Sequence, residues 1–316
     1  YIVDSLTDVV AELASEGTDS VLANITGYTL GASSNTEWLV LGTGIASGTG
    51  NLNANTLLGN SVANTLSGAA GNDSIAAGSG DDSLDGGADN DTLLGEAGND
   101  TLNGGTGNDS LLGGAGNDYF FVDSSTDVVS DTAGIDSVSA NVSDYTLGSD
   151  VEVLILDVSG VKGTGSASDN TLIGNTADNT LDGAAGNDSM VGGTGNDYYI
   201  VDSTSDAIYE VTSGGTDSVT ASVSGYTLAA ETEFLSLSGT VAVGAGNSLA
   251  NTLVGNASDN TLDGGTGIDS LAGGLGNDYY IVDSLTDVVA ELASEGTDSV
   301  LANITGYTLG ASSNTE

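Results

Sequence analysis

The sequence contains no cysteine, histidine, proline or arginine, and its only basic side chain is Lys162. Without cysteine and histidine, the chain can form no disulfide framework, no zinc finger and no Cys–His or Ser–His nucleophile pair. Nucleic acid is excluded as a partner, because its binding depends on Lys and Arg side chains that neutralise phosphates. An anionic membrane surface would repel the chain, and no run of about 18 apolar residues is present that could insert directly into a bilayer.

Acidic residues and glycine dominate what is present. The 316 residues include 45 Asp and Glu, which give a formal net charge of -44, and 49 glycines. Such a charge on a chain with few apolar residues favours disorder. A folded state therefore requires something that offsets the repulsion between carboxylates.

A long repeat organises the chain. Residues 1–37 recur without a change at residues 280–316, an offset of 279. Within that period, an aromatic strand that ends in Val-Asp marks three related modules. We divide the chain into a first module at 1–119, a second at 120–198, a third at 199–279, and the start of the next 279-residue repeat at 280–316. The main block of shorter repeats lies at residues 50–121.

The shorter repeat is nine residues long, as in GGTGNDSLL at 104–112 and GGAGNDYFF at 113–121. Its sixth residue is acidic and its eighth is apolar. Glycine permits the positive φ angles of a tight turn, and alternation along a strand points the eighth residue to one face. Each nonapeptide is thus predicted to form a six-residue turn and a three-residue strand, with two nonapeptides in each eighteen-residue coil. Stacked coils would give parallel sheets around a thin apolar core.

The segments between the nonapeptide blocks keep part of the nine-residue spacing, since Asp127 and Asp136 follow Asp118 at nine and eighteen residues. We expect them to continue the same stack of coils, and the alternative is a small separate sheet. Trp38 aligns with Val153 and Phe234 of the other modules, which favours a buried or groove position over a sugar-binding platform.

Aspartates eighteen residues apart would lie on the same edge of successive coils, about 4.8 Å apart, where they repel each other. A divalent cation between them would turn this repulsion into attraction. Asp carboxylates and turn carbonyls are hard ligands that suit Ca²⁺, and up to about ten ions could bind in this chain. The predicted metal ligands are Asp73, Asp82, Asp91, Asp100, Asp109, Asp118, Asp127, Asp136, Asp188, Asp197, Asp206, Asp217, Asp269, Asp278, Asp287 and Asp298.

Asparagine replaces the sixth-position aspartate at six places: Asn55, Asn64, Asn170, Asn179, Asn251 and Asn260. An amide carries no charge. We expect these coils to hold no ion or to hold one weakly, and their side chains to stack by hydrogen bonding instead.

The two quoted nonapeptides resemble the GGxGxDxUx repeat of the RTX, or haemolysin-type calcium-binding, family. The likeness covers the nonapeptide blocks, and the longer modules resemble those of very large RTX surface proteins. The resemblance implies an all-β, right-handed parallel β-roll, or β-solenoid, that folds on binding Ca²⁺ outside the cell after type I secretion. It also implies that sixth-position aspartates and turn carbonyls bind the ions.

Taken together, these observations predict a non-catalytic, secreted structural protein: a tandem-repeat segment of a Ca²⁺-stabilised filament, adhesin stalk or surface-layer-like polymer at the cell surface. Its expected partners are Ca²⁺ and further copies of the repeat or neighbouring chains, with glycans as a further class. One alternative is an RTX module that assists the secretion and folding of a toxin or hydrolase. Another is a solenoid face that binds glycan or ice.

Overall fold

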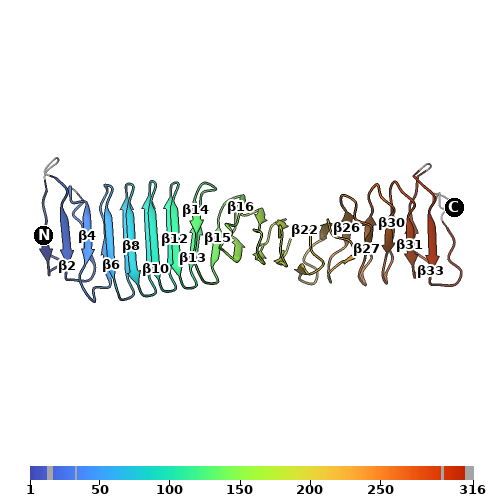
Figure 1. Ribbon diagram of the computed structural model, residues 1–316, viewed down its shortest axis with the longest axis horizontal. Helices are drawn as coiled ribbons and strands as arrows, with labels where there is room; N and C mark the ends of the chain where they lie inside the picture. The colour runs from blue at the N-terminus through green and yellow to red at the C-terminus, as the bar shows by residue number, and fades with distance from the viewer. Residues whose placement is uncertain (13–16, 33, 293–294, 310–316) are drawn as a thin grey trace. The chain divides into compact units, whose positions relative to one another are not determined.

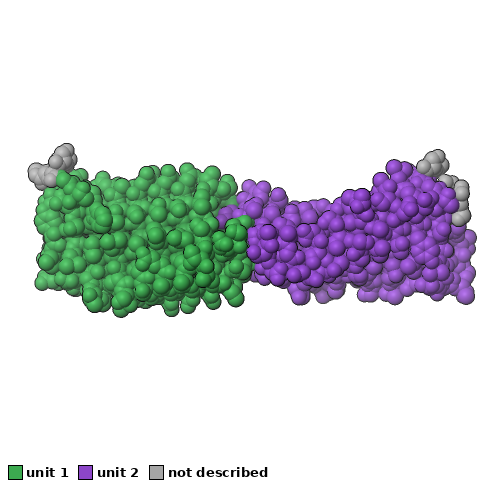
Figure 2. Space-filling view, viewed as in Figure 1, with its two compact units in different colours: residues 1–142, 147–157 green, residues 143–146, 158–316 purple. Residues whose placement is uncertain are grey.

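The computed structural model of the protein describes residues 1–12, 17–32, 34–292 and 295–309. The chain divides into two units, residues 1–142 with 147–157 and residues 143–146 with 158–316, which are coloured separately in Figure 2. Each unit is a stack of coils built from parallel strands, as the ribbon in Figure 1 shows. The predicted all-β parallel solenoid is therefore confirmed. The described part of the chain contains no helix long and apolar enough to cross a membrane.

In unit 1, the strands alternate between two sheets as the chain winds from coil to coil. The first sheet runs in the order β1 (Ile2–Val3), β2 (Ser20–Ala23), β4 (Trp38–Leu41), β6 (Thr56–Asn60), β8 (Ser74–Ser79), β10 (Thr92–Ala97), β12 (Ser110–Ala115) and β14 (Val128–Ser130). The second runs in the order β3 (Tyr28–Thr29), β5 (Ser47–Thr49), β7 (Thr65–Ala70), β9 (Ser83–Ala88), β11 (Thr101–Thr106), β13 (Tyr119–Val122), β15 (Ser137–Ala140) and β17 (Val153–Leu156).

Unit 2 repeats the arrangement with shorter strands. One series comprises β19 (Thr171–Ile173), β21 (Ser189–Val191) and β23 (Ala207–Tyr209). A second sheet comprises β16 (Asp144–Thr146), β18 (Lys162–Thr164), β20 (Thr180–Asp182), β22 (Tyr198–Val201), β24 (Ser218–Ala221), β26 (Phe234–Leu237), β28 (Thr252–Val254), β30 (Ser270–Ala272) and β32 (Val288–Val289). A third comprises β25 (Tyr226–Thr227), β27 (Val243–Ala245), β29 (Thr261–Asp263), β31 (Tyr279–Val282) and β33 (Ser299–Ala302).

Neighbouring coils of the nonapeptide blocks stack with a register of eighteen residues. Leu93 of β10 pairs with Ile75 of β8 on one side and with Leu111 of β12 on the other. This register places equivalent positions of alternate nonapeptides in one column. The eighth-position side chains form the core, and Leu93 and Leu111 are fully buried. Burying each leucine stabilises the fold by about 1.5–3 kcal/mol, so the column of such residues is the main apolar contribution.

Strand length differs from the prediction in one unit. The nonapeptide strands of unit 2, such as β20, are three residues long as expected, but β7 to β12 of unit 1 are six residues long. In unit 1 the pairing continues into the turn, where Glu96 pairs with Gly114 and Ala97 with Ala115. Glu96 adopts a φ of 76° there, a left-handed conformation that glycine adopts without strain.

The segments after the nonapeptide blocks continue the solenoid, as expected, because β15 pairs with β13 and β17 pairs with β15. The expectation of a buried position for Trp38 was wrong. Its side chain is 37% exposed, and the equivalent Phe234 is exposed as well. Strand alternation explains this, since the next residue, Leu39, points into the core.

Candidate metal centre

Aspartates of successive coils are joined through one carboxylate oxygen. Asp100 Oδ1 accepts the backbone N–H of Asp82 at 2.8 Å, and the N–H of Asp100 donates to Asp118 Oδ1 at 2.7 Å. We call this series of bonds the aspartate ladder. It joins all the pairs expected from the spacing: Asp73/Asp91, Asp82/Asp100, Asp91/Asp109, Asp100/Asp118, Asp109/Asp127, Asp118/Asp136, Asp188/Asp206, Asp197/Asp217, Asp269/Asp287 and Asp278/Asp298.

Where the residue before a sixth-position aspartate or asparagine is itself Asn or Asp, its side chain forms a second series of bonds in the opposite direction. Asp81 Oδ1 accepts the N–H of Asn99 at 2.9 Å, and Asn99 Oδ1 accepts the N–H of Asn117 at 2.8 Å. Fifth-position side chains thus bond to the following coil, whereas sixth-position side chains bond to the preceding one. An Asn-Asp pair of this kind therefore joins its coil to the following coil through Asn and to the preceding coil through Asp.

The second carboxylate oxygen of the inner ladder residues is buried without a hydrogen-bond partner. An unpaired charge in such a place costs several kcal/mol even after relaxation. The same oxygen, at the same place in successive coils, is left in this state in ten aspartates. These oxygens are Oδ2 of Asp73, Asp82, Asp91, Asp100, Asp109, Asp118, Asp188, Asp197, Asp269 and Asp278.

In nine of the ten aspartates the unpartnered oxygen faces the first glycine of its own nonapeptide, where the absence of a side chain leaves a small space, and in the nonapeptide of Asp82 this position is Ala77. A Cβ built on Gly86 would strike Asp91 Oδ2 and lie 2.6 Å from the carbonyl oxygen of Gly104. A Cβ built on Gly95 would strike Asp100 Oδ2 and lie 2.7 Å from the carbonyl oxygen of Gly113. A carboxylate oxygen and a carbonyl oxygen therefore line the same space, which we call the glycine cradle.

The electrostatics of the ladder oppose its ionisation. Burial raises the pKa of Asp73 to about 7 and that of Asp91 and Asp100 to about 6, against the lowering effect of the backbone N–H that each accepts. The neighbouring carboxylates raise these pKa values further. Because Lys162 is the only basic side chain, the neutralising charge must come from solution as protons or as cations.

Three of the predicted ligands lie in the ladder but have both oxygens bonded to backbone N–H groups. Asp127 accepts from Asp109 through Oδ1 and from Ser124 through Oδ2, at 3.0 and 3.2 Å. Asp206 and Asp287 cap the equivalent turns in the other blocks in the same way. These carboxylates are satisfied by the protein itself, unlike the ten inner ones.

The remaining predicted ligands, Asp136, Asp217 and Asp298, lie at the ends of the three blocks. Each meets a further acidic residue that the sequence analysis missed, namely Asp131, Glu210 and Glu291 respectively. The sequence holds a signal for them: each of these acids follows the last full nonapeptide aspartate of its block by 13 residues. It occupies the coil position at which a first glycine would otherwise stand.

A glutamate continues the ladder beyond two of these ends. The N–H of Asp136 donates to Glu152 Oε2 at 2.9 Å, and the N–H of Asp217 donates to Glu233 Oε2 at 2.8 Å. Glu37 accepts from Asp19 in the same way at 2.8 Å. Each of these three glutamates directly precedes a strand of its module, and its side chain accepts the N–H of the last aspartate of the ladder.

The side chains of the asparagine coils bond to backbone groups and do not stack on one another as expected. Asn64 Oδ1 accepts the N–H of Asn60 at 2.8 Å, and its Nδ2 donates to the carbonyl of Ile45 in the preceding coil at 2.9 Å. Asn260 repeats both bonds with Asn256 and Val241. The amide oxygen thus lies beside the first glycine, where the backbone N–H four residues earlier satisfies it, and the amide nitrogen makes the bond to the preceding coil.

The donors at the glycine cradle are carboxylate and carbonyl oxygens, which are the ligands that Ca²⁺ prefers, and they include no nitrogen or sulfur ligand typical of transition metals. The residues therefore fit Ca²⁺. Asp Oδ2 and the first-glycine carbonyl of the next coil on the same edge would hold the ion.

Comparison with curated proteins gave no significant relative. A comparison with protein families found four matches to the RTX calcium-binding nonapeptide repeat, at residues 58–93, 94–129, 164–199 and 245–280. All ten aspartates with an unpartnered oxygen lie within these matches. These four stretches of the chain are RTX calcium-binding nonapeptide repeats.

Proposed function

We propose that the chain is a non-catalytic structural segment of a secreted protein, in which Ca²⁺ bound along the aspartate ladder holds successive coils together. One observation carries the proposal: the same buried oxygen is unpartnered in ten equivalent aspartates, nine of which lie beside a glycine cradle. A catalytic centre brings different functional groups together at one place, whereas these aspartates repeat the same arrangement in successive coils.

Bound Ca²⁺ would supply the positive charge that the chain lacks. The ladder aspartates would then remain ionised inside the fold, and the Oδ1 bonds to the preceding coil would position each Oδ2 for the ion. Removal of Ca²⁺ would leave buried negative charges next to one another, which the thin apolar core would offset only in part.

An extended role follows from the repeat. A solenoid grows by adding coils without a change in design, and the 279-residue period recurs without a change over its 37 overlapping residues. Further copies of the repeat are the proposed partners, and the proposed setting is a filament, adhesin stalk or surface layer. Extracellular Ca²⁺-binding modules work at about 10⁻⁴–10⁻³ M, which suits a protein that folds after export.

The proposal is tested by circular dichroism and single-molecule pulling in Ca²⁺, in Mg²⁺ and in chelator. We expect a strong β spectrum and high unfolding forces in millimolar Ca²⁺ only, with a weak β spectrum and a marginally stable fold in chelator. An unchanged spectrum on chelation would contradict the role of Ca²⁺. A β spectrum in Ca²⁺ with negligible resistance to force would contradict the structural role and favour a module that assists secretion.

A further inference from the structure

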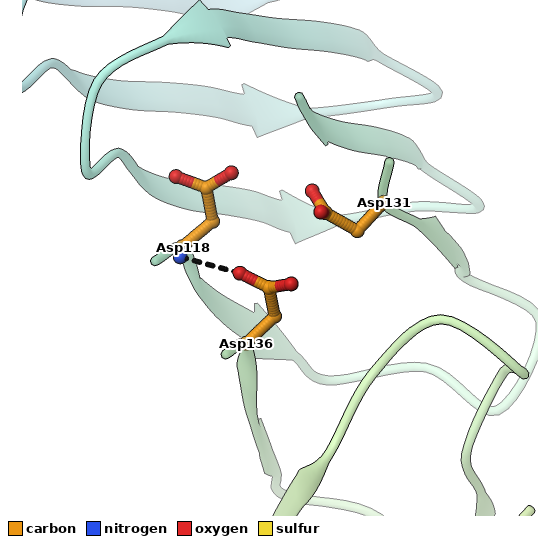
Figure 3. A group of neighbouring side chains, drawn as sticks. All are labelled: Asp118, Asp131 and Asp136. Carbon is orange, nitrogen blue, oxygen red and sulfur yellow. Dashed lines mark hydrogen bonds between the residues drawn. The ribbon is translucent and has the colours of Figure 1, made fainter. Parts of the chain in front are cut away.

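We call each bonded pair of ladder aspartates in successive coils a rung. The last rung of each nonapeptide block differs from the rungs within the block. At the end of the first block, one carboxylate oxygen each of Asp118, Asp131 and Asp136 lies within 4.8 Å of the others. Figure 3 shows the three side chains turned toward a common space, with the N–H of Asp118 bonded to Asp136. All three side chains are buried, at no more than 5% exposure.

The same arrangement recurs at the ends of the other two blocks, with Asp197, Glu210 and Asp217 in one and Asp278, Glu291 and Asp298 in the other. In the ladder, the glycine cradle is lined by the carbonyl of the next first glycine. At the block ends, a Cβ built on Gly113 would instead strike Asp118 Oδ2 and Asp131 Oδ1. A carboxylate has thus taken the place of a carbonyl ligand.

The oxygens in these groups include several that have no partner in the described structure. Glu291 is only 3% exposed, and both of its carboxylate oxygens are buried without a hydrogen-bond partner. Oδ2 of Asp118, Asp197 and Asp278 points into the same three spaces and is also unpartnered. The hydroxyl of Tyr280 accepts the N–H of Gly273 at 2.7 Å, whereas the equivalent hydroxyl of Tyr199 in the second block donates to Glu210. The unpartnered oxygens indicate that each of the three spaces binds a ligand from solution.

We propose that each block ends in a three-carboxylate cation site that binds Ca²⁺ more tightly than the rungs within the block. We call these three groups the terminal sites. The inference rests on the proposed uptake of Ca²⁺ by the ladder, and it adds Asp131, Glu210 and Glu291 as ligands.

Charge explains the order of affinity. A ladder rung offers its cation carboxylates together with neutral carbonyls, whereas a terminal site offers one carboxylate more. Ca²⁺ affinity in protein loops rises with the number of charged ligands and with site rigidity. Asp131 accepts three backbone bonds, from Gly114 at 2.7 Å, from Thr132 at 2.7 Å and from Ala133 at 2.9 Å, so its carboxylate is already positioned. The terminal sites therefore fill first and fix the end of each block.

The test is calorimetric titration of the full chain with Ca²⁺ alone. The wild-type chain is expected to show a class of three sites at least about tenfold tighter than the rest. The triple variant Asp131→Asn, Glu210→Gln and Glu291→Gln keeps every ladder aspartate and is expected to lose that class. The control variant Asp4→Asn, Asp85→Asn and Asp150→Asn removes the same charge from exposed positions and is expected to keep it.

Each outcome separates this inference from the proposed function. An unchanged isotherm in the first variant, or an equal loss in both variants, overturns the terminal sites and leaves the ladder standing. A wild-type chain that binds no Ca²⁺ overturns the proposed function itself. If the first variant fails to form β structure at saturating Ca²⁺, the wild-type isotherm decides, because a single class of sites there also overturns the inference.

Discussion

Asp100 Oδ1 accepts the backbone N–H of Asp82 at 2.8 Å, while Oδ2 of the same carboxylate is buried with no hydrogen-bond partner. One oxygen therefore fixes the coil-to-coil register, and the other is free for a cation. This division of the carboxylate accounts for the acidic sixth position. In the asparagine coils the amide instead turns its oxygen to the first glycine and its N–H group to a carbonyl of the preceding coil, and it brings no charge to the place of the ion.

Asp100→Asn is expected to change stability in opposite directions with and without Ca²⁺. In Ca²⁺ the variant loses a charge from two rungs, because Asp100 also lies beside Asp118, and it should be less stable by about 1–3 kcal/mol. In chelator it should be more stable than wild type, since a buried unpaired charge is gone. Denaturant unfolding in both conditions measures the effect.

The matched control is Asp81→Asn, one residue away and exposed, whose oxygen accepts the N–H of Asn99. This control should be nearly neutral in both conditions. Destabilisation of the Asp100 variant to the same extent with and without Ca²⁺ would show that the carboxylate acts only as a hydrogen-bond acceptor.

The glycine cradle predicts that a single methyl group can close a cation site. Gly95 lacks a positive φ, so its backbone tolerates alanine, but the new Cβ would strike Asp100 Oδ2. Gly95→Ala should therefore shift the Ca²⁺ midpoint of folding upward by about tenfold, or 1.4 kcal/mol. Gly31→Ala is the control, because its nearest atoms are 3.7 Å away.

The natural sequence contains the reverse case. Ala77 stands five residues before Asp82, at the position where the other nonapeptides with an unpartnered aspartate oxygen have glycine. It is fully buried. Ala77→Gly should lower the Ca²⁺ midpoint, even though glycine costs about 0.5–1 kcal/mol of backbone entropy in chelator. An increase in the midpoint would mean that the space above the first glycine is not where the ion binds.

The metal-free chain should be more stable in acid than at neutral pH. Burial raises the pKa of Asp73 and Asp136 to about 7 and that of Asp118 and Asp188 to about 6, above the value of about 3.9 for an unfolded aspartate. Groups of this kind contribute stability that is fully present below the unfolded pKa and is lost as the pH rises through 6 to 7.

Thermal melts in chelator should accordingly give a higher melting temperature at pH 5 than at pH 8. In Ca²⁺ the dependence should reverse, because protons compete with the ion for the same oxygens. A metal-free melting temperature that rises with pH would contradict the burial of these carboxylates in a metal-free fold.

The ladder pairs could be predicted from the sequence, because a fixed spacing of eighteen residues places Asp82 and Asp100 on one edge of the solenoid. This placement does not depend on the conformation of the turn between them. The satisfied state of Asp127 could not, since it depends on a local turn in which Ser124 donates its N–H to the same carboxylate. Short Ser-x-x-Asp segments that follow the strand are a usable signal for such turns.

The terminal sites were missed for a different reason. Asp131 stands at a glycine position of the coil, and a search for sixth-position aspartates passes over it. In the third block, Asp298 follows Asp278 by 20 residues rather than 18, so the regular spacing is already lost there. Only the three-dimensional stack shows that Glu291 lies beside both of them.

The most direct test of the central claim is anomalous diffraction from crystals of the full chain grown in millimolar Ca²⁺. The account predicts an anomalous peak beside the second carboxylate oxygen of Asp100 and at the equivalent place in each inner rung. A folded solenoid in the same crystals with no anomalous peak between its aspartates would contradict it.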